Sequence, residues 1–211
     1  MKKFISLLSG GLDSPVAAFL MIKQNFHPIF ISFLTSEDEN HSLKKKVIQI
    51  VKFLKMFTKN TIKLYLINHD SNLEIFQSKS ERKLTCVLCK RLMIRIATQI
   101  GKNENTNLIL TGDILGEQAS QTLDNLFVYN NLLKNFTILR PLIGWDKLEV
   151  IKLSEKIGLY KICSQSSASC QYNPQFPETH AKPFEISNAE SNVNLIGLVG
   201  ESLKNAEILY L

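Results

Sequence analysis

The sequence has no long apolar run, few cysteines and no repeated or low-complexity segment. No stretch approaches the roughly 18 apolar residues that a membrane-spanning helix needs. The opening MKKFISLL begins like a secretory signal, but its apolar run stops at Ser9, too early for the hydrophobic part of such a signal. Four cysteines are too few to hold 211 residues together with disulfide bonds. We therefore expect a soluble, cytoplasmic protein whose thiols bind metal or take part in redox chemistry.

The composition is that of a folded domain with a modest excess of positive charge. Hydrophobic residues make up 45% of the 211 residues and charged residues 21%, which excludes global disorder and allows one ordinary domain. A net charge of +6 is compatible with a polyanionic partner without requiring one. Lysines at 44–63 and basic residues at 82–95 form two runs, which are either solvated helix faces or contacts to nucleic-acid phosphates.

Strand-like and helix-like segments alternate along most of the chain. Strands are predicted at 3–8, 28–34, 62–67, 108–110 and 137–139, and helices at 15–24, 42–57, 82–100, within 116–131, at 146–157 and at 194–203. This alternation predicts an α/β fold with a doubly wound, mostly parallel, five-stranded sheet. We expect residues 1–183 to form one domain, with an irregular loop at 160–183, and residues 184–211 to pack on it as a helical segment.

A glycine-rich loop, SGGLDS at 9–14, lies between the first predicted strand and the first predicted helix. Glycines let successive backbone N–H groups converge in front of a helix N-terminus, where an anion is favoured. Asp13 would repel phosphates unless a cation such as Mg²⁺ lay between them. The loop has neither the Walker A pattern nor the dinucleotide-binding glycine pattern. A simple glycine turn followed by a helix cap is the alternative interpretation.

This loop resembles the PP-loop of the ATP pyrophosphatases, a class with the adenine nucleotide alpha hydrolase-like fold. Further segments at 89–97, 111–126 (which includes ASQTLDNL) and 139–147 (LRPLIGWDK), with Cys170 beyond them, are similar to the catalytic domain of the tRNA 4-thiouridine synthase (tRNA sulfurtransferase) family. The resemblance implies an ATP-dependent enzyme that adenylates O4 of a tRNA uridine and replaces it with sulfur. It also implies a link to thiamine biosynthesis.

The resemblance also implies which residues form the site. The implied ATP-binding residues are Leu7, Leu8, Ser9, Gly10, Gly11, Asp13, Ser14, Ser32, Phe33, Lys90, Gly112 and Gln121. The implied catalytic residues are Asp13, Lys147 and Cys170. A fixed lysine near the α-phosphate can stabilise the charge that builds there, whereas the alternative for Lys147 is a solvated first-turn lysine.

The cysteines at 86 and 89 form a C-x-x-C pattern, which indicates metal or redox chemistry. The resemblance implies that Cys86, Cys89 and Cys170 hold a [4Fe-4S] cluster with one iron open to carry sulfide. A zinc site with His180 as fourth ligand and a metal-free persulfide on Cys170 are the alternatives. Cys163 matches no family position and is predicted to be a buried thiol.

Full-length members of that family carry additional ferredoxin-like and THUMP domains that grip tRNA, and some carry a rhodanese domain. This chain begins at the PP-loop strand. We therefore expect a separate THUMP-like RNA-binding protein as partner, besides tRNA itself, and a homodimer is a further prediction. Two other functions remain open at this point: thiolation or amidation of a small molecule, and a non-catalytic nucleotide- or cluster-binding subunit.

Overall fold

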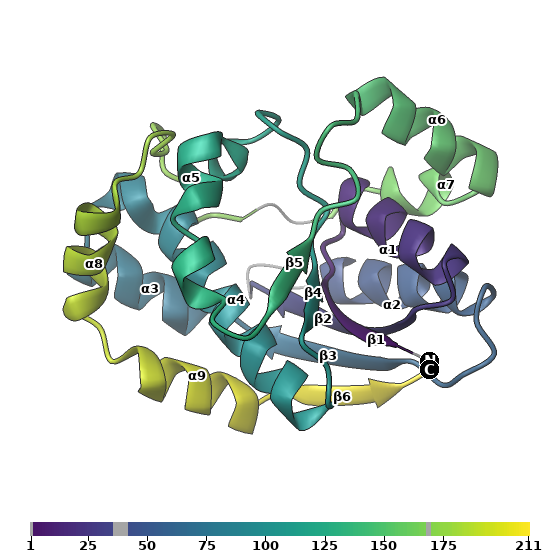
Figure 1. Ribbon diagram of the computed structural model, residues 1–211, viewed down its shortest axis with the longest axis horizontal. Helices are drawn as coiled ribbons and strands as arrows, with labels where there is room; N and C mark the ends of the chain where they lie inside the picture. The colour runs from purple at the N-terminus through teal and green to yellow at the C-terminus, as the bar shows by residue number, and fades with distance from the viewer. Residues whose placement is uncertain (1, 36–41, 168–169) are drawn as a thin grey trace.

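The computed structural model describes residues 2–35, 42–167 and 170–211. Within them a six-stranded sheet has the order β5-β4-β1-β2-β3-β6 (Figure 1). The strands are β1 (Lys3–Leu7), β2 (His27–Leu34), β3 (Lys63–Asn68), β4 (Leu108–Leu110), β5 (Thr137–Leu139) and β6 (Glu207–Tyr210). The first five strands pair in parallel, and β6 pairs antiparallel with β3.

Helices cover both faces of the sheet. They are α1 (Asp13–Lys23), α2 (Ser42–Lys55), α3 (Asp70–Lys79), α4 (Thr85–Asn103), α5 (Leu123–Phe127), α6 (Lys147–Ile157), α7 (Tyr160–Cys163), α8 (Pro183–Ser191) and α9 (Leu195–Lys204). Consecutive strand residues point to opposite faces, so Phe4 joins the core under α1 and α2 whereas Ile5 joins the core under α3, α4 and α9. Two apolar cores result, one on each side of the sheet.

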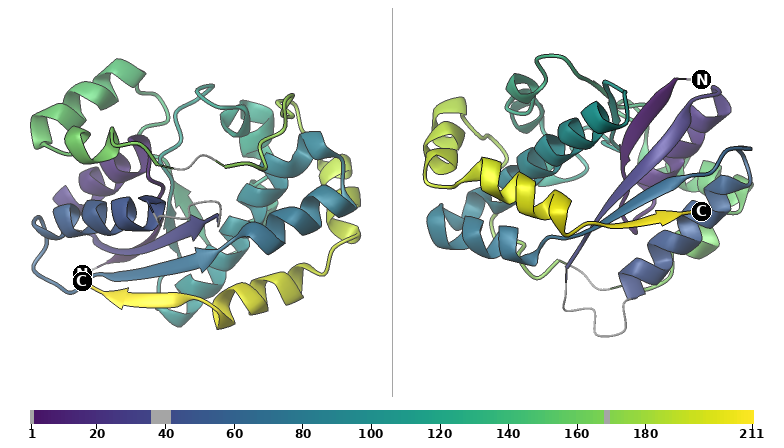
Figure 2. Two further views of the ribbon diagram at one scale, coloured as in Figure 1. Left: turned by 180° about the vertical axis from the view of Figure 1, so that it is seen from behind. Right: turned by 90° about the horizontal axis from the view of Figure 1, so that it is seen from below.

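The predicted doubly wound α/β fold is confirmed, but the predicted strand count is wrong. The sixth strand, β6, lies at the sheet edge beside β3 (Figure 2), within the segment 184–211 that we expected to be helical. Its four residues, EILY, are too few to show an alternating pattern, and the pairing with β3 decides their conformation. The structure also contains α3 and α8, and the short α7 inside the expected irregular loop at 160–183.

The strand order creates a crevice at the carboxyl ends of two neighbouring strands, β1 and β4. From β1 the chain leads through α1 to β2 on one side, whereas β4 lies on the other side of β1 and is reached through α4. The loops that follow β1 and β4 therefore diverge at the carboxyl ends of these strands, which is where ligands bind in open α/β sheets. None of the helices in the described residues is long and apolar enough to cross a membrane.

Candidate active site

The glycine-rich loop is held by its own two serines. The Ser9 backbone N–H donates to Ser14 Oγ at 2.9 Å, the two hydroxyl oxygens lie 3.0 Å apart, and the Gly11 N–H donates to Ser9 Oγ at 3.2 Å. Leu12 occupies the N-cap position of α1, and its side chain has no group that could accept a hydrogen bond. The side-chain cap that the alternative interpretation expects is therefore not formed at Leu12, although the turn itself is present. A helix start without a side-chain cap can bind an anion.

Gly112, in the loop after β4, lies directly against this helix start. A Cβ at this position would lie 2.5 Å from the Ser14 backbone nitrogen and 2.6 Å from its Cα. Both of these are backbone atoms, so they could not move aside as a flexible side chain would. The two loops that flank the crevice can meet only because position 112 has no side chain.

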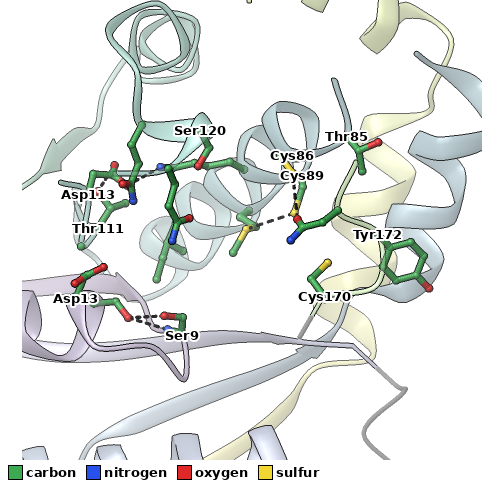
Figure 3. Close-up of a pocket in the computed structure, with 18 of the residues that line it drawn as sticks. Ser9, Asp13, Thr85, Cys86, Cys89, Thr111, Asp113, Ser120, Cys170 and Tyr172 are labelled. Atoms are coloured by element: carbon green, nitrogen blue, oxygen red, sulfur yellow. Dashed lines mark hydrogen bonds and ion pairs between the residues drawn. The ribbon is translucent and has the colours of Figure 1, made fainter. Parts of the chain in front are cut away.

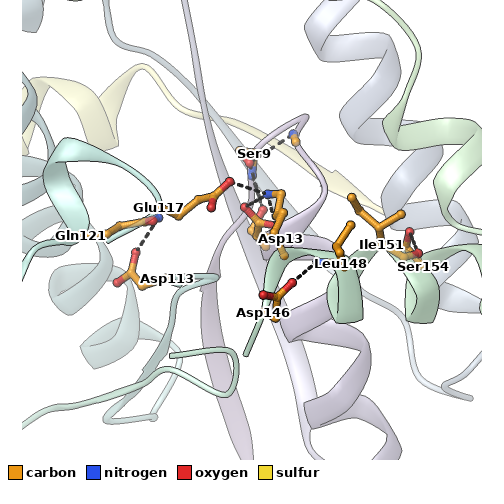
Figure 4. A network of polar contacts seen from close by, with 12 residues as sticks. Ser9, Asp13, Asp113, Glu117, Gln121, Asp146, Leu148, Ile151 and Ser154 are labelled. Carbon is orange, nitrogen blue, oxygen red and sulfur yellow. Dashed lines mark hydrogen bonds and ion pairs between the residues drawn. The ribbon is translucent and has the colours of Figure 1, made fainter. Parts of the chain in front are cut away.

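Lys147 forms an ion pair with Asp13 at the glycine-rich loop. Its Nζ lies 2.6 Å and 2.8 Å from the two Asp13 carboxylate oxygens and 3.5 Å from Glu117 Oε1 (Figure 4). Lys147 is the first residue of α6, and a capping box between Asp146 and Glu149 fixes that helix start. The alternative of a solvated lysine is therefore wrong, because an ammonium group lies between two carboxylates in front of α1.

A second charged cluster lies across the crevice around Asp113. Lys90 Nζ donates to Asp113 Oδ1 at 2.6 Å, while Thr111 Oγ1 and Arg140 Nε donate to Oδ2 at 2.8 and 3.2 Å. Burial alone would raise the pKa of Asp113, but these donors, Lys90 above all, hold it below its ordinary value. Burial lowers the pKa of Lys90 despite its partner. Gln121 Oε1 is buried without a hydrogen-bond partner among the described residues, so it can accept from a ligand.

Asp113, Thr111 and Arg140 were not selected from the sequence, although they lie inside the segments that carry the family resemblance. A signal was present, because Thr111 and Asp113 follow directly after β4 and Arg140 follows directly after β5. Polar residues that end adjacent parallel strands meet at one sheet edge.

Two adjoining cavities, of about 400 and 350 Å³, contain all the residues expected to bind ATP. The larger is lined by Leu7, Ser9, Asp13, Ser14, Lys90, Gly112 and Gln121, and the smaller by Leu7, Leu8, Ser9, Gly10, Gly11, Ser32 and Phe33. Leu7 and Ser9 line both cavities, so the glycine-rich loop lies between them. The smaller cavity is also lined by Lys46 and by Cys163, whose predicted burial is confirmed.

The larger cavity has two chemically different ends (Figure 3). We call the part around Ser9, Asp13 and Asp113 the phosphate end, and the part around Cys86, Cys89 and Cys170 the sulfur end. Cys86 and Cys89 lie on the first turn of α4, and Cys170 lies on the segment that leads to Tyr172. One continuous cavity therefore joins the glycine-rich loop to three free thiols.

Two thiols of the sulfur end resist ionisation. Burial raises the pKa of Cys86 to about 11 and raises that of Cys89 further. Cys170 is exposed. Among the described residues, no three His, Cys, Asp or Glu side chains are grouped as a metal site. Cysteine sulfur is the donor that iron–sulfur clusters take, and three such side chains line this one cavity. His180, the zinc ligand of the alternative interpretation, instead contacts Asp124 Oδ2 at 2.8 Å.

A buried histidine touches this end of the cavity. His69 follows β3, is 1% exposed, and places Nε2 at 3.4 Å from Cys89 Sγ. Burial lowers the pKa of His69 to about 4, and the neighbouring Asp70 opposes this shift only in part. The spacing of the histidines does not indicate ligand binding by His69, whereas its position just after a predicted strand is the signal that points to it.

Most of the second basic run is engaged within the protein. Lys83 pairs with Glu178 at 2.9 Å, and Arg91 and Arg95 both pair with Glu190, at 2.8 and 2.9 Å. In the first run, Lys44, Lys46 and Lys63 contact Glu207 Oε2, Gln165 O and Glu104 Oε1, each at 2.6 Å. These contacts favour structural roles over binding of nucleic-acid phosphates for the side chains involved.

A glycine-rich loop at the switch point of a parallel sheet, with an aspartate in the loop and a lysine from the helix after β5, defines a PP-loop nucleotide-binding domain of the ATP pyrophosphatase type. Comparison with known proteins identifies the family. The model of the family described as "Thiamine biosynthesis protein (ThiI)" matches residues 1–195, and the chain belongs to this family.

The relatives of the chain are named as sulfurtransferases. It is 34% identical over 194 residues to a "Probable tRNA sulfurtransferase" of Methanocaldococcus jannaschii, covering 92% of this chain and 50% of the relative. Identity to the protein of the same name from Methanosarcina mazei is 38% over 210 residues, covering 99% and 52%. The chain thus spans about half the length of the curated relatives that it matches.

Two solved structures are also similar to this chain. The structure described as a "4-thiouridine synthetase - RNA complex with bound ATP" superposes with a TM-score of 0.94 at 28% identity, covering 100% of this chain and 55% of that one. The NMN synthetase of Francisella tularensis superposes with a TM-score of 0.56 at 17% identity, covering 95% and 84%, which shows a shared fold.

Proposed function

We propose that this chain is the catalytic part of an ATP-dependent tRNA sulfurtransferase that converts a uridine to 4-thiouridine and forms AMP and pyrophosphate. The observation that carries the proposal is the shared cavity: Asp13, in ion-pair contact with Lys147, lines one end of it, and three cysteines line the other. Support comes from relatives named tRNA sulfurtransferase and from the similarity to a 4-thiouridine synthetase with RNA and ATP bound.

The phosphate end would activate the uridine. Backbone N–H groups of the loop and of the start of α1 would bind the phosphates of ATP. Uracil O4 would attack the α-phosphorus, and the bond to pyrophosphate would break. Lys147 Nζ, freed from Asp13 by the incoming anion, would stabilise the negative charge that builds on the α-phosphate.

Asp13 is also the residue that would hold Mg²⁺. Its carboxylate and that of Glu117 are hard oxygen donors, and Lys147 Nζ lies between them at 2.6 and 3.5 Å, so the position suits a cation. The ion would supply charge neutralisation for the pyrophosphate. Asp13 would orient it, which accounts for a carboxylate in a phosphate-binding loop.

The sulfur end would complete the transfer. A sulfide sulfur would attack C4 of the adenylated uridine, and AMP would leave with the former O4. If a Cys170 persulfide attacked instead, the first product would be a disulfide between Cys170 and the nucleoside. A second cysteine thiol would then break this bond, which releases 4-thiouridine and leaves a disulfide in the protein. Cys86, Cys89 and Cys170 would present this sulfur, and we propose a [4Fe-4S] cluster held by their thiolates as its carrier. The raised pKa values of Cys86 and Cys89 keep these thiols protonated in the absence of metal. Metal binding would displace their protons and convert them to thiolates.

The test measures 4-thiouridine in tRNA from cells that lack the gene for this chain. Wild-type protein and Lys152→Met, an exposed lysine on the same helix as Lys147, should restore the nucleoside. Lys147→Met should leave at most about 1% of the wild-type level, because it removes the ammonium group that would stabilise the negative charge on the α-phosphate in the transition state. Unchanged 4-thiouridine in the deletion strain would refute the tRNA assignment. Pyrophosphate release from ATP without tRNA would favour a small-molecule substrate.

The remaining partners are proposals of the same kind. With tRNA as substrate we predict a cytoplasmic location, a separate THUMP-like RNA-binding protein and a homodimer. Purification of the tagged chain with its associated RNA and proteins would check the tRNA and the THUMP-like protein, and its mass in solution would check the homodimer.

A further inference from the structure

Lys46, on α2, places a buried positive charge beside the glycine-rich loop. It is 6% exposed and lines the smaller cavity together with Gly10 and Gly11. A Cβ at Gly10 would lie 2.7 Å from Leu43 Cδ1 and 3.5 Å from Lys46 Cδ. Helix α2 therefore packs directly on the loop, and this packing places the Lys46 side chain against Gly10.

The charge of Lys46 is not neutralised within the described part of the chain. Lys147, at the same loop, pairs with Asp13 at 2.6 Å. Lys46 has no such carboxylate partner among the described residues, and its Nζ donates to the backbone oxygen of Gln165 at 2.6 Å. Burial lowers the pKa of Lys46, and the nearby Cys163 thiol opposes this shift only in part. Because a buried charge is costly unless it is paired, this position suits an anionic ligand.

The proposed reaction places the pyrophosphate group of ATP on this side of the loop. In transfer reactions at phosphorus, the attacking and leaving oxygens lie roughly in line. Uracil O4 must attack from the larger cavity, because the sulfur that later attacks C4 comes from the cysteines that line it. The leaving pyrophosphate then lies on the opposite side of the α-phosphorus, away from the sulfur end. Among the described residues, Cys86, Cys89 and Cys170 line the larger cavity and not the smaller one, which adjoins the same loop.

We propose that Lys46 is a substrate-binding residue whose ammonium group contacts the β- and γ-phosphates of ATP and then the pyrophosphate that leaves. When the bond between the α-phosphorus and the bridging oxygen breaks, its electron pair stays with pyrophosphate. The negative charge on this group therefore increases during the reaction, and a fixed ammonium group stabilises it. Lys147 would act on the α-phosphate instead. The inference rests on the proposed function only in that ATP is the substrate and is cleaved at this bond.

Calorimetric titration with ATP, AMP and inorganic pyrophosphate, each in the presence of Mg²⁺, tests the assignment. Lys46→Met keeps a side chain of similar length and removes its charge. It should weaken the binding of ATP and of pyrophosphate about 30-fold, the loss expected when a hydrogen bond to a charged group is removed. AMP lacks both phosphates, so its affinity should not change measurably. Lys45→Met is the matched control, because Lys45 is the preceding residue of α2 and is exposed.

Urea denaturation without ligand separates this role from a structural one. In the free protein Lys46 is a buried cation without a carboxylate partner among the described residues, so an apolar side chain of similar size should be tolerated. The urea concentration at the midpoint of unfolding should therefore be unchanged or higher in Lys46→Met. A lower midpoint together with equal losses for all three ligands would show that Lys46 stabilises the fold, and it would overturn the proposal.

Wild-type protein gives a reading that needs no variant. Acetylation of Lys46 by an N-hydroxysuccinimide ester can be followed residue by residue by mass spectrometry. ATP or pyrophosphate at about ten times its Kd should slow this reaction about tenfold, because only the unoccupied fraction of the protein reacts. AMP should not slow it, and Lys45 should react at the same rate under all conditions.

Three results would contradict the role of Lys46. The first is wild-type affinity for ATP in Lys46→Met, the second is an equal loss of affinity for AMP, and the third is equal protection of Lys46 by AMP. None of these measurements uses tRNA. Unchanged 4-thiouridine in the deletion strain would therefore refute the proposed tRNA function alone, whereas any of the three results would refute the role of Lys46 alone.

Discussion

The two ends of the cavity are built in different ways. The phosphate end depends on short loops that follow strands: backbone N–H groups, a glycine at 112 and charges that are already paired, such as Lys147 with Asp13. The sulfur end depends on side chains from distant segments, because His69 from the end of β3 and Asn173 from the loop before α8 set the surroundings of the α4 cysteines. Tertiary contacts assemble both ends, but one is built mainly from strand-end loops and their backbone and the other from side chains of separate elements.

The largest effect should come from the ion pairs between α8 and α4, which we call the clamp. Arg91, with 2% of its side chain exposed, pairs with Glu190, and Arg95 pairs with the same carboxylate. Glu190→Ala leaves a buried guanidinium without its partner and should lower the free energy of unfolding by about 3 kcal/mol. Urea denaturation measures this, with Glu201→Ala, an exposed carboxylate on α9, as the matched control.

The same carboxylate gives the clamp a pH dependence. Burial would raise the pKa of Glu190, but Arg91 and Arg95 together hold it below its ordinary value of 4.5. Its stabilising effect is therefore fully present above pH 4.5 and is lost as the pH falls through the lower pKa of the folded state. The stability difference between wild type and Glu190→Ala should shrink in that acid range. A difference that stays constant down to pH 2 would contradict the charge-pair explanation.

The second-largest effect should be confined to the phosphate end of the cavity. Gly112→Ala places a methyl group 2.5 Å from the Ser14 backbone nitrogen, so the loop after β4 and the start of α1 must move apart. We expect ATP affinity to fall about 100-fold, since a displacement of about 1 Å at such a site has consequences of this size. Gly144→Ala, where a Cβ meets nothing within 4 Å, is the control. Calorimetric titration with ATP measures both.

Cysteine alkylation in the Gly112→Ala protein tests the separation. Cys86 and Cys89 should keep their wild-type rates, because their contacts come from β3, α4 and the segment around Asn173 rather than from the glycine-rich loop. If alkylation of both cysteines changes as much as ATP affinity does, the phosphate end and the sulfur end are not independent of each other.

The same contrast explains what the sequence could predict. The glycine-rich loop and the strands around it follow from local pattern, and the ATP-binding residues assigned by resemblance line two adjoining cavities. The strand β6 and the contact between His69 and Cys89 could not be predicted, because each is decided by a partner far away in sequence: β3 for residues 207–210, and Cys89 for His69. The sequence left two interpretations of the basic runs open for the same reason, since the carboxylates that neutralise much of the second run, Glu190 and Glu178, are distant in sequence.

The smallest effect tests the hydrogen bond between Cys86, at the sulfur end, and Asn173. Asn173→Leu removes the oxygen that accepts the Cys86 thiol proton, so the thiol loses a hydrogen bond that its thiolate never had. The pKa of Cys86, raised by burial to about 11, should then fall slightly, and its alkylation at pH 8 should become about two- to threefold faster. Cys89 in the same protein is the control and should not change. Slower alkylation of Cys86 in this variant would show that Asn173 presents its amide N–H to the sulfur and would contradict this explanation.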